Sequence, residues 1–415
     1  MDNLGKIIEK ITKPRHEEDF IDRLNYSITV GILLAAAFTI IAKEYGGDPI
    51  QCWLPAELAS QKGWEEYAED YCFVENTYYI PLEQNIPYST KHRGNVELTY
   101  YQWVPFLLIL QALMFTFPHI FWRMLNWLSG IQIRAIITMA CSTDRLAPDG
   151  KEVSEVADAV ALHLHTALRS KQKFHYLFQT HPFLIISRLI RLSYLCFIYL
   201  TTKLLFIGNA VLQYWLLNFY LGASGYDMTM ALLSHQTWES TGYFPRVTMC
   251  DFRVRGIGNR HTHTIQCVLM ANMFNEKIYI GLWWWILIVL TLTCLNFIYW
   301  LFVLHNGDSK YKFLVAILRL GQPKNKILEH SMNGFMRYVG ADGILVTRLM
   351  AQNAGEIITS MIIARLYDLY IQDEAPRNTS PIDNRMMYST TNVPHLDSPD
   401  EKTKDGAGFA YVPFS

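Results

Sequence analysis

The sequence lacks the motifs that a nucleotide-dependent or redox enzyme needs. It contains no Gly-rich phosphate-binding loop and no Cys-x-x-Cys pair, and His119 and Lys203 are the ionisable residues inside its apolar segments, where a membrane enzyme would need convergent ionisable groups at a span end. His261 and His263 look like a fragment of a metal site, but no second pair of ligands lies near them, so we interpret them as part of a solvated loop. We therefore expect no catalytic residue, no cofactor and no metal.

An excess of charge is also missing, because 36 Lys and Arg face 37 Asp and Glu and the net charge is −1. Such a balance gives no reason to expect a nucleic-acid partner. Four long stretches carry almost no formal charge, with only His119 and Lys203 inside them, and each is about as long as the roughly 20 residues that cross a bilayer. We expect four membrane spans in contact with lipid, at Tyr26–Ala42, Trp103–Phe121, Leu192–Leu221 and Ile278–Leu304.

The cysteines and the basic residues indicate the orientation of these spans. The loops after spans one and three lie on the same side of the membrane, and each contains two cysteines, which form disulfides only in an oxidising environment. The first of these loops has four basic residues against ten acidic ones, whereas the loop after span two has nine against five. We therefore expect a multi-pass plasma-membrane protein with both termini in the cytoplasm.

The fold class expected from these features is an all-α membrane protein with disulfide-bonded extracellular loops and a helical cytoplasmic domain. Two stretches outside the spans show helical amphipathic faces, one from Val153 to Leu168 and one from Ile358 to Leu369, and both are expected to pack in the cytoplasmic part. The expected segments are an N-terminal helix (1–25), spans (26–42, 103–121, 192–221, 278–304), extracellular loops (43–102, 222–277), a cytoplasmic loop (122–191), a cytoplasmic helical domain (305–371) and a disordered tail (372–415).

The second span begins with the string Tyr100, Tyr101, Gln102, Trp103 and Val104. Tyr and Trp favour the membrane interface in any family, so the string also fits an ordinary aromatic belt. The string nevertheless resembles the signature of the innexins, the gap-junction proteins of invertebrates. Other features similar to that family are two cysteines in each outer loop, where connexins have three, and the stretch from Phe274 to Tyr279 that leads into Trp283, Trp284 and Trp285.

The resemblance implies a subunit of gap-junction channels and hemichannels that passes ions and small metabolites passively. It implies a homo-oligomer, an eightfold ring that docks with a ring on the opposite cell, with possible mixing with other innexins. The alternative is a pannexin-like channel that releases metabolites without docking. The extracellular loops contain no Asn-x-Ser/Thr glycosylation acceptor, and this favours docking because a glycan would obstruct it.

In innexins the N-terminal segment folds into the pore mouth, so the resemblance implies that Asp2, Asn3 and Lys6 line the pore. A surface helix along the inner leaflet is the alternative, since Leu4, Ile7, Ile8 and Ile11 form one apolar face that ends before Pro14.

Four extracellular cysteines allow three pairings. We favour Cys52 with Cys267 and Cys72 with Cys250, because these bonds would link both loops behind one docking surface, and we expect the other three cysteines to stay reduced.

The third span contains a polar stripe of Thr202, Asn209 and Gln213, at spacings that place them along one side of a helix. These residues either line an aqueous path or form hydrogen bonds with neighbouring helices. Lys203, in the same span, is interpreted as a snorkelling or paired cation. Arg253, Arg255 and Arg260 are expected to form a basic rim at the outer mouth of the pore.

Overall fold

The computed structural model describes residues 18–56, 62–75, 77–81, 84–94, 96–142, 150–174, 193–221, 224–235, 242–321 and 329–378. The chain divides into two units, 1–369 and 370–415, and the sections below concern the first. The expected N-terminal helix and its residues Asp2, Asn3 and Lys6 lie outside the described residues.

Four helices are long and apolar enough to cross a membrane, which confirms the four predicted spans. The first is continuous from Phe20 to Gly46 and combines helix α2 (Phe20–Arg23), the π-helix η1 (Leu24–Thr29) and helix α3 (Val30–Gly46). Its described part therefore begins six residues before the predicted start at Tyr26, because Asp22 and Arg23 are accommodated in the helix rather than ending it.

The second and fourth spans also extend beyond their apolar stretches at both ends, whereas the helix of the third begins two residues after the predicted start at Leu192. The second joins η2 (Tyr101–Trp103), α6 (Val104–Asn126) and η3 (Trp127–Ser129). The third is α10 (Tyr194–Leu221), and the fourth is α13 (Met270–His305). A helix can continue beyond the hydrocarbon core of the bilayer because its backbone hydrogen bonds form within the helix. Apolar composition therefore indicates which residues cross the bilayer, but not where the helix begins and ends.

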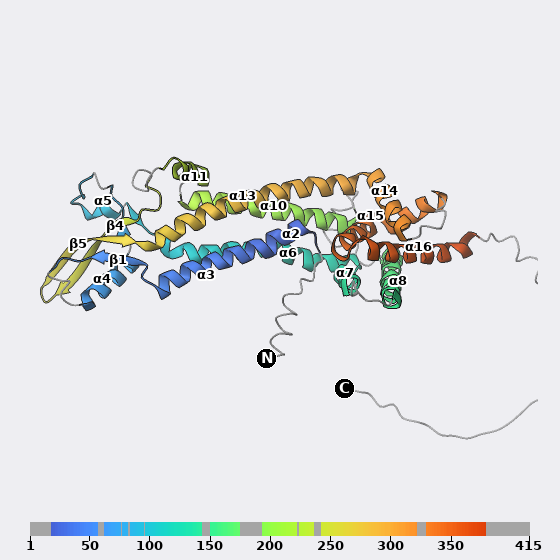
Figure 1. Ribbon diagram of the computed structural model, residues 1–415, viewed down its shortest axis with the longest axis horizontal. Helices are drawn as coiled ribbons and strands as arrows, with labels where there is room; N and C mark the ends of the chain where they lie inside the picture. The colour runs from blue at the N-terminus through green and yellow to red at the C-terminus, as the bar shows by residue number, and fades with distance from the viewer. Residues whose placement is uncertain are drawn as a thin grey trace, which may run out of the picture. The chain divides into compact units, whose positions relative to one another are not determined.

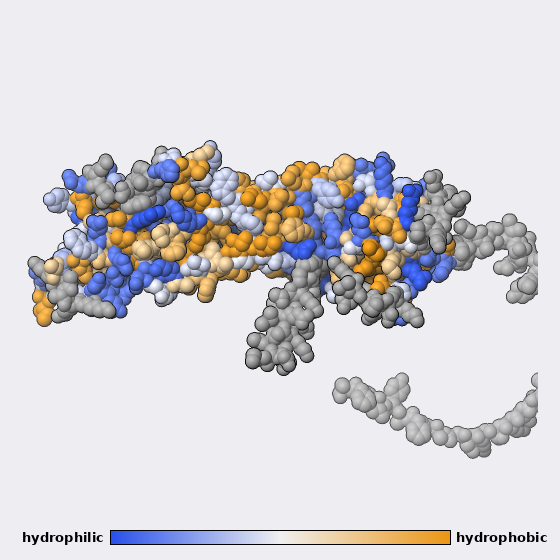
Figure 2. All heavy atoms as spheres, viewed as in Figure 1, coloured by the Kyte–Doolittle hydropathy of each residue, from blue (hydrophilic) through white to orange (hydrophobic). Residues whose placement is uncertain are grey.

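The four span helices pack into one bundle, in which α3 lies against α6, α6 against α10, α10 against α13, and α13 against α3 (Figure 1). Its core is filled by buried apolar side chains, among them Leu33, Ile40, Phe115 and Ile286. On the face shown in Figure 2, hydrophobic residues cover much of the surface over these helices. Such exposed apolar surface on long helices is expected where lipid or neighbouring membrane helices replace water.

The two cysteine-bearing loops form a five-stranded antiparallel sheet at one end of the bundle, in the order β1-β5-β4-β2-β3 (Figure 1). The sequence analysis did not predict this sheet, in which β4 and β5 form a local hairpin while β1 joins β5 and β2 joins β4 from distant parts of the chain. His261 and His263 belong to a strand rather than to the expected loop. The strands are β1 (Ile50–Trp53), β2 (Thr77–Tyr78), β3 (Glu97–Leu98), β4 (Val247–Gly256) and β5 (Asn259–Leu269).

Three helices accompany the sheet: α4 (Lys62–Glu75), α5 (Thr90–Gly94) and α11 (Gly225–Leu233). Helix α4 packs on strands β1 and β4, and α11 packs on the span helix α13. The contact of α11 is close, because a Cβ atom at Gly225 would lie 2.2 Å from the indole ring of Trp283. Glycine is therefore required sterically at the start of α11.

The opposite end of the bundle carries helices from the middle loop and the C-terminal part, namely α7 (Ile133–Ser142), α8 (Gly150–Phe174), α14 (Gly307–Gly321), α15 (Glu329–Ala354) and α16 (Glu356–Asn378) (Figure 1). The predicted amphipathic faces are buried at Val160 and Leu164 of α8 and at Ile362 and Leu366 of α16. Helix α16 continues beyond Gln372, where the tail was predicted to begin, and residues 379–415 lie outside the described residues.

Candidate functional site

Two disulfides join the two cysteine-bearing loops to each other. Cys52 is bonded to Cys267, and Cys72 is bonded to Cys250, which is the pairing that the sequence analysis favoured. The first bond links directly opposite residues of β1 and β5, and the second attaches α4 to β4. Three of these sulfur atoms lie within 4.8 Å of one another, but all are oxidised, so the cluster offers no thiolate to a metal. Cys141, Cys196 and Cys294 take no part in a disulfide, as predicted.

The aromatic string at the start of span two connects the bundle to this outer domain. Tyr101 is fully buried in the core that surrounds the disulfides, and its hydroxyl donates to the carbonyl of Phe73 at the end of α4 (3.1 Å). The Gln102 amide donates to the carbonyl of Val74 (3.2 Å), whereas Trp103 is 61% exposed, as an interfacial residue would be. The string therefore has a structural role at the junction of membrane and outer domain, and only Trp103 fits the simple aromatic belt.

Asp251 of β4 is the polar centre of the outer domain. Its carboxylate accepts hydrogen bonds from Arg93 Nη1 (2.8 and 2.9 Å), from the Tyr78 hydroxyl (3.1 Å) and from the Thr264 hydroxyl (2.9 Å). Burial, together with the adjacent Asp251 charge, raises the pKa of Tyr78 to about 12. These bonds join the first loop to both strands of the β4-β5 hairpin and hold the hairpin base in place.

The outer half of the β4-β5 hairpin projects from the sheet. Within the part of the chain that the structure describes, residues 250–265 pair with each other but with no third strand. Ile257 at the tip is fully exposed, and Gly258 beside it has a left-handed backbone (φ 79°) that completes the tight turn. The predicted basic rim residues Arg253, Arg255 and Arg260 lie on this exposed half.

Helix α4 separates two grooves of opposite character. One is lined by acidic residues that include Glu65, Glu66 and Glu69, and the other combines Tyr67 and Tyr71 with the arginines of the hairpin. Burial raises the pKa of Glu69, with further contributions from neighbouring acids, while its carboxylate accepts a hydrogen bond from the backbone of Cys52 (3.2 Å). The outer domain thus presents a basic projecting hairpin and a separate acidic helix.

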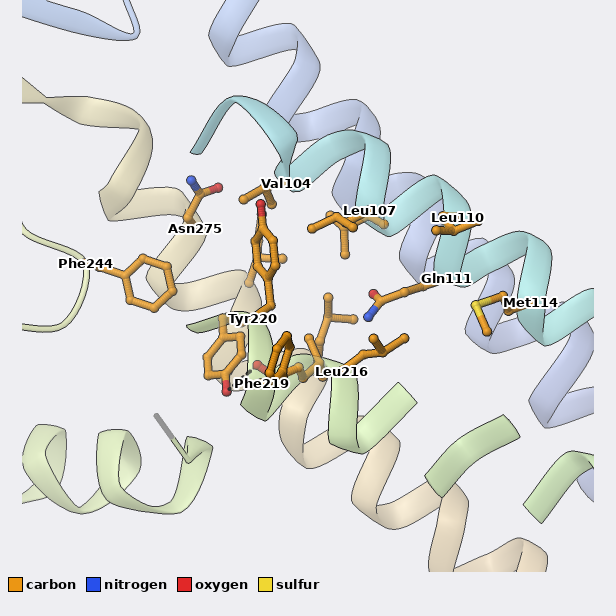
Figure 3. A pocket seen from close by; sticks show the side chains of 15 residues that line it. Val104, Leu107, Leu110, Gln111, Met114, Leu216, Phe219, Tyr220, Phe244 and Asn275 are labelled. Atoms are coloured by element: carbon orange, nitrogen blue, oxygen red, sulfur yellow. Dashed lines mark hydrogen bonds between the residues drawn. The ribbon is translucent and has the colours of Figure 1, made fainter. Parts of the chain in front are cut away.

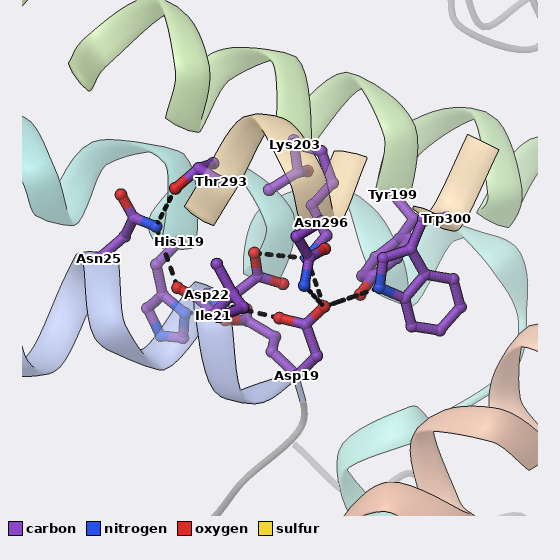
Figure 4. A network of polar contacts seen from close by, with 12 residues as sticks. Asp19, Ile21, Asp22, Asn25, His119, Tyr199, Lys203, Thr293, Asn296 and Trp300 are labelled. Carbon is purple, nitrogen blue, oxygen red and sulfur yellow. Dashed lines mark hydrogen bonds and ion pairs between the residues drawn. The ribbon is translucent and has the colours of Figure 1, made fainter. Parts of the chain in front are cut away.

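At the other end of the bundle, a buried charge network joins three spans (Figure 4). Lys203 of α10 is completely buried, and its ammonium group donates to Asp19 (2.6 Å) and to Asp22 (2.7 Å). Asp19 also accepts bonds from the side chains of Asn296 (2.9 Å) and Trp300 (2.7 Å) of α13. The network fixes the start of span one against spans three and four.

The residues beside this network extend it to span two and to the cytoplasmic helices. Glu18, the first described residue, lies 2.9 Å from a ring nitrogen of His119 on α6, and its carbonyl accepts a bond from Asn353 of α15 (3.2 Å). In the π-helix, the Asn25 amide donates to Thr293 of α13 (2.9 Å). The chain therefore leaves the bundle toward residues 1–17 from a firmly held point.

The structure separates the two interpretations of the polar stripe in span three. Thr202 and Gln213 are buried within the subunit, where Thr202 donates to the carbonyl of Ile198 (2.9 Å) and Gln213 to the sulfur of Met114 on α6 (3.3 Å). Only the Gln213 contact reaches a neighbouring helix, as the second interpretation requires, because Ile198 belongs to the same helix as Thr202. Lys203, which the sequence analysis interpreted as either a snorkelling or a paired cation, is paired.

The sequence analysis did not identify Asp19 and Asp22. Both precede the apolar stretch and were assigned to a cytoplasmic segment. A signal was available, because a lysine within a span requires a counter-charge, and two aspartates three residues apart lie just before another span.

Comparisons with known proteins agree with these features. The family model described as Innexin matches residues 18–370. Innexin unc-9 of Caenorhabditis elegans is 35% identical over 367 residues, which cover 86% of this chain and 93% of that protein. Innexin-16 of the same species is 34% identical, with 91% of this chain and 96% of that protein covered, and Innexin eat-5 is 32% identical, with 90% and 92% covered. The four spans, the two bonds between the outer loops and these matches together show that the chain belongs to the innexin family.

Proposed function

We propose that the protein is a subunit of gap-junction channels and hemichannels, through which ions and small metabolites pass passively between adjacent cells. Membership of the innexin family carries this proposal. The outer domain supports it, because two disulfides and the Asp251 contacts hold the two extracellular loops as one body that is suited to meeting an identical body.

A pore in this protein requires several subunits. The interior of the four-helix bundle is filled by side chains such as Leu33 and Phe115, which are completely buried, so the bundle itself encloses no wide path. We therefore place the pore on the axis of a homo-oligomeric ring, with eight subunits as the family resemblance implies. Mixed rings with other innexins are part of the proposal.

The proposed orientation places the sheet outside the cell and both termini in the cytoplasm, in a multi-pass plasma-membrane protein. It rests on the disulfides, which need an oxidising environment, and on the excess of basic residues in the middle loop. No cofactor and no catalytic group takes part in passive conduction.

Docking is assigned to the projecting β4-β5 hairpin. An exposed hairpin with unpaired edges and an apolar tip offers both main-chain groups and apolar surface to a partner. The acidic side chains of α4 lie in a different groove. Two facing rings that meet through the hairpins keep their acidic helices apart. The arginines of each hairpin must then lie opposite neutral or acidic groups of the other ring, because like charges repel.

Recordings from paired cells test this function. Ile257→Asp should abolish coupling between cells while currents across a single membrane persist, because the tip would carry a desolvated charge at the seam. Val74→Asp is the matched control, since Val74 is 71% exposed and belongs to α4 rather than to the hairpin, and it should retain coupling. Absence of coupling in the parent, with normal surface delivery and single-membrane currents, would instead indicate a non-docking release channel.

A further inference from the structure

A cavity of about 230 Å³ lies between spans two, three and four, toward the ends nearest the outer domain (Figure 3). Its walls come from α6, α10 and α13 and from the loop that carries Phe244. A purely apolar cavity of about 150 Å³ is large enough for benzene, whereas drug-sized sites begin at about 300 Å³. The cavity therefore has room for a slender molecule and excludes a bulky one.

The residues that line the cavity determine what kind of molecule it can bind. None of the lining residues is charged, and most are aliphatic or aromatic, including Leu107, Met114, Leu216 and Phe219. These residues lie on spans whose outer surface faces lipid, so a ligand reaches the cavity from the bilayer rather than from water. An acyl chain fits this lining, but a phosphate or carboxylate group inside it would find no counter-charge.

Two amide side chains give the cavity a polar requirement. Gln111 of α6 is 6% exposed and Asn275 of α13 is 2% exposed, and both line the cavity. The Gln111 carbonyl oxygen and both polar atoms of Asn275 have no hydrogen-bond partner in the described residues. An unsatisfied buried polar group costs about 1–3 kcal/mol, so these atoms favour a ligand that both donates and accepts. A hydroxyl group has this property, whereas an ester or a hydrocarbon does not.

The backbone at one end of the cavity is held in an uncommon conformation. Phe244 has φ 47°, which a bulky residue adopts only when its surroundings impose it. Its ring is buried and contacts Tyr100 (5.8 Å between centroids) and Tyr279 (5.8 Å). The end wall is thus built by packing from three parts of the chain and does not depend on a loose loop.

We infer that the cavity binds a neutral lipid with a single acyl chain and a hydroxyl-bearing head, of the monoacylglycerol class. Its head exchanges hydrogen bonds with the Asn275 and Gln111 amides, and the first carbons of its chain fill the cavity. The rest of the chain leaves the cavity toward the bilayer on the side of Leu110 and Phe219, which are 51% and 70% exposed. The inference concerns the wall of the bundle and does not depend on docking or on conduction.

A photoreactive monoacylglycerol with a diazirine on its chain tests the inference on the full-length protein in nanodiscs. Adducts located by peptide mass spectrometry should fall on α6 and α10 residues that line the cavity. Leu107→Trp fills the cavity from its partly buried wall and should lower this labelling about tenfold. Leu113→Trp, the same substitution on the same helix at a side chain that is 64% exposed and outside the cavity, should leave it unchanged.

Competition experiments test the polar requirement. Unlabelled monoacylglycerol should displace the probe, and the methyl ester of the same fatty acid should be about fivefold weaker, as expected for loss of about one hydrogen bond. Gln111→Leu should reduce the difference in competition between the monoacylglycerol and the methyl ester. This variant still tests the inference if Leu107→Trp fails to fold. The inference is overturned if Leu107→Trp labels like the parent, if the ester competes equally well, or if adducts avoid the cavity because a neighbouring subunit seals it.

Discussion

At the scale of single residues, the most demanding feature is a lysine buried at the level of the membrane. Lys203 is fully buried and forms ion pairs with Asp19 and Asp22, at 2.6 and 2.7 Å. A buried charge is tolerated when it is paired and hydrogen-bonded, and the Asn296 and Trp300 side chains complete the shell of Asp19. The first span therefore depends on a residue in the third.

Lys203→Met should destabilise the folded protein by about 3–5 kcal/mol, because it leaves two buried carboxylates without their cation. Surface delivery and the melting temperature in detergent should both fall. Lys277→Met is the control, since Lys277 is 57% exposed and its pair with Glu276 contributes at most about 1 kcal/mol. If Lys203→Met had the same melting temperature as the parent, the Lys203 ion pairs would make no net contribution to stability.

The raised pKa of Glu69 predicts how the stability of the protein changes with pH. Burial raises its pKa in the folded protein, so the folded state holds this proton more tightly than the unfolded state does. The stability that Glu69 contributes is therefore fully present below its unfolded pKa and is lost as pH rises through the folded pKa. Glu69→Gln keeps an acceptor for the Cys52 backbone and removes this loss.

The melting temperature of Glu69→Gln relative to the parent should therefore increase from about pH 4 to about pH 7. Glu66→Gln, at an exposed position of the same helix, serves as the control. A relative melting temperature that falls with rising pH would contradict the assigned direction.

At the scale of elements, the first span acts as a fixed base for the N-terminal segment. Glu18 contacts His119 of α6 and Asn353 of α15, and Asp19 caps helix α2 by accepting from the Asp22 backbone (2.9 Å). The π-helix that follows is tied to α13 through Asn25 and Thr293. A segment that starts from such an anchor has a defined origin at the end of the bundle that carries α15.

Deletion of Met1–Ile11 should alter or block conductance, since the proposed pore mouth lies within reach of this segment. Glu18 and the charge network are retained in the truncated protein, so its folding and surface delivery should be normal. Single-membrane currents, normalised to surface protein, provide the measurement. Parental conductance at parental surface density would favour the alternative of a helix that lies on the inner leaflet.

At the scale of the whole molecule, the basic and acidic side chains of the outer domain lie on separate surfaces. The exposed half of the hairpin carries arginines and Ile257, whereas Glu65 and Glu66 lie on α4 in a separate acidic groove. Symmetric docking places like surfaces opposite each other, so a seam of neutral or mutually opposite groups is favoured over one that opposes acidic helices.

Replacing both Glu65 and Glu66 by Lys should therefore leave coupling between cells largely intact, because these side chains are kept from the seam. Cys52→Ser should abolish coupling, since it releases β1 from β5 and a native disulfide typically contributes about 2–5 kcal/mol. Paired-cell recordings measure both effects. Loss of coupling in the charge-reversed protein, despite normal surface delivery, would place the two acids at the junction.

The sequence by itself determined the four spans, the amphipathic cytoplasmic helices and the family. Spans are readable because about 20 uncharged apolar residues satisfy a local condition that the bilayer imposes, and cysteine positions restrict the disulfides to three pairings. Tertiary structure alone decided the sheet, the burial of Tyr101, the pairing of Lys203 with Asp19 and Asp22, and the cavity beside Gln111. Each of these joins residues more than a hundred positions apart or several helices at once, and such contacts follow from packing, which local periodicity does not encode.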